Sequence, residues 1–246
     1  MGPLGIISGT ISLTGLQKIF SLREEIFTCS QAKIVFFSSP DLIFIPRHGH
    51  DRQVSFSPPH LIPHLDHFHL LATRGVEEVI GIYSTGSLHD HLKPGMMMIP
   101  DDFICFYPTP TSVANKPHHI TPAMSEETRN QLFAIAEKLG INIEKGGIYW
   151  QTSGPRLETK AEIRMMSQMA DIVGMTMVSE AVLAMEFNMN FAALCSIDNY
   201  AHGIGETPLT NEVIIQQSRR NANITEQIIR RYSEDFQFRR RQADKA

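Results

Sequence analysis

Arg47 and His48 directly follow a short apolar run, in the sequence I-P-R-H-G. The planar guanidinium of arginine can hold a phosphate through paired hydrogen bonds, and a neighbouring imidazole supplies a further donor. Ser8, Gly9 and Thr10 follow the first apolar run of the chain, where backbone N–H groups and a hydroxyl can bind an anion. Both segments indicate an anion site, although a surface arginine and ordinary turn residues are the simpler explanation of each segment taken alone.

Further polar residues stand where apolar runs give way to helical patterns. Glu158 lies in T-S-G-P-R-L-E-T, Thr176 in V-G-M-T, and Asn199 in S-I-D-N-Y-A. Ligands of α/β proteins bind at the carboxyl ends of strands, so these side chains are candidates for a binding site. A buried glutamate there can accept a hydrogen bond from an N–H of the ligand. Its alternative role is to stabilise the first turn of a helix.

Histidines gather at positions 60, 64, 67 and 69 and again at 89 and 91, but their pattern does not indicate a metal. Pro63 lies between His60 and His64, whose spacing of four would otherwise place two imidazoles on one helical face. No carboxylate completes a zinc-binding motif of the H-E-x-x-H type. We therefore expect neutral histidines at the surface or at an interface, and no metal.

The composition predicts a soluble protein of the cytoplasm. The chain has 246 residues, 42% of them hydrophobic, and its 22 basic and 26 acidic residues give a net charge of −4. This weakly negative balance argues against nucleic-acid binding. No apolar run is long enough to span a membrane, and the N-terminus lacks the basic region of a signal peptide. Three widely spaced cysteines without a C-x-x-C pair argue against a disulfide scaffold and fit a reducing compartment.

Apolar runs of strand length alternate with helical patterns along the chain. The runs cover residues 4–7, 33–37, 42–45, 78–83, 96–99, 147–150 and 191–197. Helices are predicted from residue 125 to Gly140, from 159 to about 170, from 179 to 187 and from 210 to about 236. The alternation predicts one α/β domain over residues 1–237, with helices on both faces of a sheet. Residues 238–246 contain three consecutive arginines and are predicted to be a basic, disordered tail.

Three stretches carry a more specific signal than any single residue. They are GPRLETKAE at residues 154–162, VGMTMVSEAVLA at residues 173–184 and RHG at residues 47–49. In this order they resemble the trimeric purine nucleoside phosphorylase and methylthioadenosine phosphorylase family, over residues 5–232. The resemblance implies a single-domain α/β fold with a central mixed sheet, and a homotrimer. It implies reversible phosphorolysis of purine nucleosides to free base and ribose 1-phosphate, with phosphate as co-substrate and no cofactor.

The resemblance also implies roles for particular residues. Phosphate would be held by hydroxyls, an arginine and an imidazole, from Thr10, Arg47, His48, Ser84 and Thr176. The nucleoside would be contacted by Leu157, Glu158, Met175, Asn199, Ala201 and Asn211, and by His119 reaching into a neighbouring subunit. Catalytic roles fall to Asn199, Glu158 and His48. An amide at N7 or O6 of the purine would stabilise the negative charge that develops on the leaving base.

Glu158 and Asn199 together predict a 6-oxopurine base. An ionised glutamate accepts a hydrogen bond from N1–H of such a base, and the asparagine amide can donate to O6 or N7. Relatives that act on adenine nucleosides carry serine and aspartate at these two positions. Asn211 favours a 5′-hydroxyl over a methylthio group, because an amide buried against sulfur would leave its hydrogen bonds unmade. Inosine and guanosine are therefore the expected substrates.

Two alternatives are also compatible with the sequence. A methylthioinosine phosphorylase would share the same glutamate and asparagine. A nucleoside-binding protein that has lost catalysis would account for three departures from the family pattern, namely Ile11, Tyr83 and the stretch at residues 61–67. Phosphate-dependent release of the base from inosine would distinguish an enzyme from a binding protein.

Overall fold

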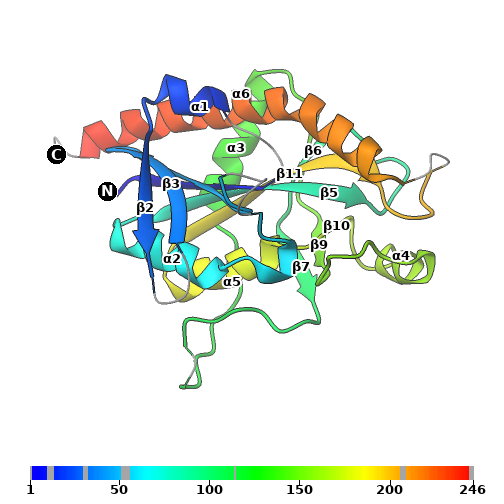
Figure 1. Ribbon diagram of the computed structural model, residues 1–246. Helices are drawn as coiled ribbons and strands as arrows, with labels where there is room; N and C mark the ends of the chain where they lie inside the picture. Colours follow the sequence, from blue (N-terminus) through cyan, green and yellow to red (C-terminus); the bar gives the residue numbers. More distant parts are fainter. Residues whose placement is uncertain are drawn as a thin grey trace.

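The computed structural model describes residues 2–9, 14–29, 33–50, 56–113, 115–205 and 209–243. Within these residues, eleven strands form one mixed sheet (Figure 1). The strands are β1 (Leu4–Ser8), β2 (Arg23–Thr28), β3 (Lys33–Ser39), β4 (Leu42–Pro46), β5 (Glu78–Ser87), β6 (Met97–Ile99), β7 (Asp102–Cys105), β8 (Ile143–Lys145), β9 (Ile148–Gln151), β10 (Ile172–Gly174) and β11 (Asn190–Tyr200). The helices are α1 (Thr14–Ile19), α2 (His64–Thr73), α3 (Glu126–Lys138), α4 (Lys160–Met166), α5 (Met177–Glu186) and α6 (Asn211–Ala243), with a single 3-10 turn η1 at Pro59–Leu61. The predicted single-domain α/β fold with a mixed sheet is confirmed.

The centre of the sheet is β5, which pairs in parallel with both β1 and β11 and antiparallel with β10. β1 also pairs in parallel with β4, so Ser8 lies beside Pro46 on one side and Ile82 on the other. The carboxyl ends of four parallel strands therefore meet at one edge of the sheet. The register of β11 against β5 shifts between Ile197 and Asn199, a bulge that changes the direction of the side chains at this edge.

Helices cover both faces of the sheet, and successive residues of each strand supply the two cores. On one face Val79, Tyr83 and Cys195 pack in a cluster with residues of α2 and α5. On the other face Ile80 and Ile82 pack with residues of α1, α3 and α6. Figure 1 shows α1 and α6 above the sheet and α2 and α5 below it. Because the strand period is two, this alternation determines which polar residues of β5 and β11 face α6.

The predicted helix boundaries are confirmed where a local capping signal determined them. The Ser125 side chain accepts a hydrogen bond from the backbone N–H of Thr128, 3.2 Å away, at the start of α3. Gly140, with φ of +68°, follows the end of that helix. Thr159 and Glu162 form a capping box at the start of α4, which ends at Met166 rather than near residue 170.

The last helix differs from its prediction. α6 continues to Ala243, so the expectation of a disordered tail from residue 238 is wrong for residues 238–243. Arginine is a good helix former, and two of the arginines bind the body of the protein. Arg239 donates a hydrogen bond to Gln131, and Arg240 pairs with Asp41 at 2.7 Å. These contacts hold the helix end against α3 and the turn between β3 and β4.

No helix in the described part of the chain combines the length and the apolar character needed to cross a membrane.

Candidate active site

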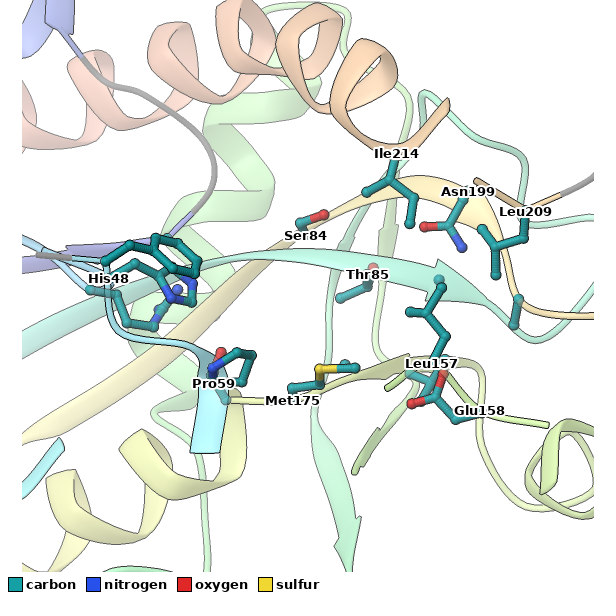
Figure 2. Close-up of a pocket in the computed structure, with 18 residues that line it drawn as sticks. His48, Pro59, Ser84, Thr85, Leu157, Glu158, Met175, Asn199, Leu209 and Ile214 are labelled. Atoms are coloured by element: carbon teal, nitrogen blue, oxygen red, sulfur yellow. The ribbon is translucent and has the colours of Figure 1, made fainter. Parts of the chain in front are cut away.

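A cavity of about 220 Å³ lies at the sheet edge where the parallel strands end (Figure 2). Strand ends, the segments that follow them and the first turns of α6 all contribute to its wall. The lining residues are Gly9, Arg47, His48, Phe56, Pro59, Ser84, Thr85, Gly86, Leu157, Glu158, Val173, Gly174, Met175, Thr176, Asn199, Ala201, Leu209 and Ile214. Nine residues predicted for the site from the sequence are among them, although they come from segments up to about 150 positions apart.

At one end of the cavity Arg47 is almost completely buried, with 2% of its surface exposed. Its Nε and Nη2 donate to the two carboxylate oxygens of Glu180 at 2.5 and 2.8 Å. Nη1 and Nη2 also donate to the carbonyl oxygens of Ile82 and Ile7, at 2.8 and 3.3 Å. Four of the five guanidinium N–H groups are thus bound by protein, which leaves at most one for a ligand.

Glu180 neutralises the charge of Arg47 in the core. Burial raises the pKa of Glu180, but the charge and hydrogen bonds of Arg47, together with His64, more than offset burial and hold that pKa below its usual range. The Tyr83 hydroxyl donates to Glu180 at 2.6 Å, and its ring lies 4.3 Å from the guanidinium carbon of Arg47. Glu180 and Tyr83 therefore fix the orientation of Arg47 in the wall of the cavity.

His48 and Gly9 complete this end. Nδ1 of His48 lies 2.7 Å from the carbonyl oxygen of Ser57, which can only accept, so Nδ1 carries the hydrogen. Nε2 is then an acceptor in the neutral ring and a donor in the protonated ring. A Cβ at Gly9 would lie 2.7 Å from Arg47 Nη1 and 3.2 Å from this Nε2, so a larger residue would intrude between the two side chains.

Thr176 lies at the start of α5 and does not cap it with its side chain. Instead, Gln151 accepts hydrogen bonds from the first helical N–H groups, those of Val178 and Ser179, at 2.6 and 3.3 Å. The hydroxyl of Thr176 is thus not needed by the helix. The positive end of the α5 dipole lies at the same wall, where it favours an anion.

Glu158 lies at the opposite end of the cavity, with 8% of its surface exposed. Its Oε1 accepts a hydrogen bond from the Thr152 hydroxyl at 2.6 Å. The N-cap of α4 is Thr159, whose partner is Glu162, so Glu158 is not used to cap the helix. Other residues therefore stabilise the first turn of the helix, which was the alternative role of Glu158. The hydrogen bond from Thr152 holds the Glu158 carboxylate at the cavity wall.

Asn199 is also at this end and follows the bulge in β11. Its Nδ2 donates to the carbonyl oxygen of Tyr200 at 2.9 Å, which uses one of the two amide N–H groups. A Cβ at Gly86 would lie only 3.0 Å from Nδ2, so glycine is what leaves space for the amide. Figure 2 shows Asn199 and Glu158 on the side of the cavity away from His48, with Ser84 and Met175 between the two ends.

Three predicted residues are not placed in the cavity. Thr10 and the side chain of Asn211 lie outside the described residues, although the backbone of Asn211 begins α6. His119 is exposed on the long segment between β7 and α3 and does not line this cavity. Its expected role concerns a neighbouring subunit, so that role stays a prediction.

Other lining residues were not predicted from the sequence. Thr85 and Gly86 lie in the same Y-S-T-G stretch as Ser84, so their motif was a usable signal. The apolar side chains of Phe56, Leu209 and Ile214 carry no chemical signal, and only the tertiary fold brings them to the cavity. Among the described residues, no group of three or more histidine, cysteine, aspartate or glutamate side chains is arranged to hold a metal ion.

Comparison with known proteins agrees with this geometry. A sequence model of the phosphorylase superfamily matches residues 25–234. The chain is 36% identical over 223 residues to a probable 6-oxopurine nucleoside phosphorylase of Archaeoglobus fulgidus, with 89% of this chain and 90% of that protein covered. It is 35% identical over 228 residues to a probable S-methyl-5′-thioinosine phosphorylase of Methanocaldococcus jannaschii, with 89% and 87% covered.

Solved structures show the same fold at lower sequence identity. A methylthioadenosine phosphorylase from Schistosoma mansoni in complex with adenine has a TM-score of 0.80 and 20% identity, covering 93% of this chain and 90% of that one. At this identity the likeness concerns the fold alone. The family match over most of the length, together with the two relatives, shows that the chain belongs to the phosphorylase superfamily, as an enzyme of the purine nucleoside phosphorylase type, a class of pentosyltransferases.

Proposed function

We propose that this enzyme catalyses the reversible phosphorolysis of 6-oxopurine nucleosides, with inosine and guanosine as substrates and phosphate as co-substrate. The products are the free base and ribose 1-phosphate, and no cofactor takes part. The observation that carries this proposal is the division of one cavity into two chemically different ends. Arg47, His48 and Thr176 suit an anion at one end, while Glu158 and Asn199 suit a purine at the other.

The base end supports a 6-oxopurine because two residues favour the same edge of the ring. Thr152 donates to one oxygen of Glu158, which leaves the carboxylate to accept from N1–H of the base and from the 2-amino group of guanine. Asn199 donates to O6 or N7. An adenine would place a lone pair at N1 opposite the carboxylate, and such a mismatch in a site that hydrogen-bonds its substrate costs on the order of 10⁴-fold in kcat/KM.

Catalysis follows from charge development between the two ends. A phosphate oxygen forms its bond to C1′ as the bond from C1′ to the purine breaks, and the electron pair moves onto the base. The Asn199 amide stabilises this negative charge where it develops. The helix dipole of α5, Thr176 and His48 hold the phosphate close to C1′, which removes most of the entropic cost of bringing two substrates together. Arg47, already paired with Glu180, contributes at most one further N–H.

A methylthioinosine phosphorylase is the second candidate, because of the apolar wall near α6. Leu209 and Ile214 flank Asn211 in the chain, and both line the cavity. Aliphatic side chains suit a thioether better than a hydroxyl, since a buried hydroxyl without a partner is costly. The relative from Methanocaldococcus jannaschii carries the name of this activity.

The experiment is a side-by-side measurement of kcat/KM at saturating phosphate for inosine, guanosine, 5′-methylthioinosine, adenosine and 5′-methylthioadenosine. The proposal predicts that inosine and guanosine exceed the adenine nucleosides by several orders of magnitude. A clear preference for 5′-methylthioinosine would favour the second candidate. A preference for either adenine nucleoside would overturn the assignment of Glu158 and Asn199 to the base. The homotrimer and the cytoplasmic location stay predictions of the sequence.

A further inference from the structure

A polar cluster lies behind the cavity, between the sheet and α6, and four of its five residues are buried. It consists of Ser84 from β5, Ser196 and Asp198 from β11, and Ser218 and Asn221 from α6. Ser84 and Ser196 are direct neighbours in the pairing of the two strands. Among the five, Ser84 also lines the cavity, so it connects the cluster with the cavity.

Asp198 is the acidic centre of this cluster and has no exposed surface. Its Oδ1 accepts hydrogen bonds from the Ser196 hydroxyl at 2.8 Å and from Nδ2 of Asn221 at 2.7 Å. Oδ2 is buried as well and has no hydrogen bond of normal geometry to any described residue. Such a carboxylate oxygen attracts any hydroxyl hydrogen within reach, because an unpaired buried charge is costly.

Two further hydroxyls, those of Ser84 and Ser218, lie next to Asp198; Ser84 is the strand neighbour of Ser196, whose hydroxyl binds Asp198 at 2.8 Å. Burial raises the pKa of Asp198 to about 6, while the neighbouring hydroxyl and amide donors of Ser84, Ser196, Asn221 and Ser218 act in the opposite direction. Asp198 is therefore ionised at neutral pH and accepts from its neighbours. A serine hydroxyl has a single hydrogen, so a Ser84 hydroxyl that donates to Asp198 presents only lone pairs to the cavity.

The position of Ser84 indicates which part of a nucleoside meets these lone pairs. Ser84 lies between the anion end at His48 and the base end at Asn199 (Figure 2). A ligand that spans both ends places its sugar there. Phosphate oxygens mainly accept hydrogen bonds and gain nothing from another acceptor, whereas the hydroxyls of ribose can donate to it.

We propose that Asp198 is a positioning residue that draws the hydroxyl hydrogen of Ser84 away from the cavity, so that Ser84 accepts a hydrogen bond from a ribose hydroxyl instead of donating one to phosphate. This inference rests on the proposed nucleoside substrate and adds a preference for ribose over deoxyribose. It assigns Ser84 to the sugar, in place of the phosphate contact that the family resemblance implies.

The test compares kcat/KM for inosine, 2′-deoxyinosine and 3′-deoxyinosine in the full-length enzyme. The wild type should prefer inosine over at least one of the deoxynucleosides. Ser84→Ala should reduce that preference by about 3- to 10-fold, the value of one neutral hydrogen bond. Asp198→Asn should reduce this preference as well. Oδ1 of the new amide keeps the donors Ser196 and Asn221, so the amide N–H group faces Ser84 and donates to it. The hydrogen of Ser84 then turns into the cavity.

Two further variants separate positioning from a general structural effect. Ser218→Ala removes another hydroxyl near Asp198 but one that does not line the cavity, so it should leave the sugar preference unchanged. The double variant Ser84→Ala/Asp198→Asn should show no more loss of preference than Ser84→Ala alone, because Asp198 acts through Ser84. Independent losses that multiply would contradict this chain of action.

The pH dependence of the sugar preference gives a second readout. Below about pH 6 the protonated Asp198 can donate to Ser84, so the wild-type preference for inosine should fall there, while in Ser84→Ala it should stay flat. The neighbours of Asp198 do not titrate in this range. They are serines and an asparagine on β5, β11 and α6 and methionines on β6, and burial raises the pKa of the Cys195 thiol. A pH effect on phosphate binding or on the base is common to inosine and its deoxy analogues and cancels in the ratio.

The outcomes that overturn the inference differ from those that overturn the function. An inosine-cleaving wild type whose sugar preference is unchanged in Ser84→Ala refutes the inference alone, even where Asp198→Asn does not fold. A raised KM for phosphate in Ser84→Ala, with the sugar preference intact, also refutes it and assigns Ser84 to the anion. A wild type that cleaves no purine nucleoside in the presence of phosphate refutes the proposed function and the inference with it.

Discussion

The contribution of the buried Arg47–Glu180 ion pair to the free energy of unfolding can be tested against a second pair in the same chain. That second arginine–glutamate pair has similar geometry but is exposed to water. Glu180→Gln keeps the shape of the side chain but removes the charge that compensates Arg47, which is 2% exposed. It also places an amide N–H group against a guanidinium that can only donate. Breaking a buried ion pair by removing one partner costs about 3 to 5 kcal/mol. That is a large part of the 5 to 15 kcal/mol typical of a folded domain.

The matched control is Glu162→Gln. Arg156 binds both oxygens of Glu162 at 2.7 and 2.8 Å, close to the distances of the buried pair, but Arg156 is 64% exposed. Water screens this pair, so its loss should change the free energy of unfolding far less. Urea unfolding followed by circular dichroism measures both variants. Similar losses in the two variants would refute the argument that burial, rather than the bidentate geometry, gives the pair its importance.

Three further predictions concern the base site and the cluster behind it. Asn199→Asp should lose activity with inosine and gain some with adenosine, because a carboxylate accepts a hydrogen bond from a 6-amino group. An unchanged ratio of the two kcat/KM values would show that Asn199 does not contact the base. Gly86→Ala should raise KM for the nucleoside more than KM for phosphate, since its Cβ would lie 3.0 Å from Asn199 Nδ2, and equal effects on both would contradict this. Burial raises the pKa of Asp198 from 3.8 to about 6, so its ionisation disfavours the folded state. Relative to Asp198→Asn, the wild type should therefore lose on the order of 2 to 3 kcal/mol of unfolding free energy as pH rises from about 4 to about 6. A difference that does not change with pH would mean that the carboxylate is not desolvated.

Much of the fold could be predicted because its signals are local. β1, β4 and β11 are continuous apolar runs buried between two helical layers, and such runs are visible in any sequence. The start of α3 and the capping box of α4 depend on side chains within three residues of each other. β2, with the sequence REEIFT, escaped prediction because half of its residues are exposed and polar, so the sheet pairing with β3 determines it.

The residues of the site were predictable to the extent that each follows a strand and has a reactive type. Arg47 and Asn199 satisfy both conditions. Their functional states were not predictable, because they depend on residues far away in the chain. Arg47 is neutralised by Glu180, which lies 133 positions later, and Asp198 and Ser84 come into one cluster only because β11 pairs with β5. The helical end at residues 238–243 was missed for the same reason, since its arginines bind α3 and residues near β4.

The dependence of inosine cleavage on phosphate distinguishes a phosphorylase from a hydrolase and from a binding protein. The purified enzyme is incubated with inosine with and without phosphate, hypoxanthine is followed by absorbance, and the sugar product is identified by phosphorus NMR. We predict that hypoxanthine appears only with phosphate and in an amount equal to the ribose 1-phosphate formed. Release of hypoxanthine with free ribose in the absence of phosphate, or binding of inosine without any release, would contradict the assignment of the two ends of the cavity to an anion and a purine.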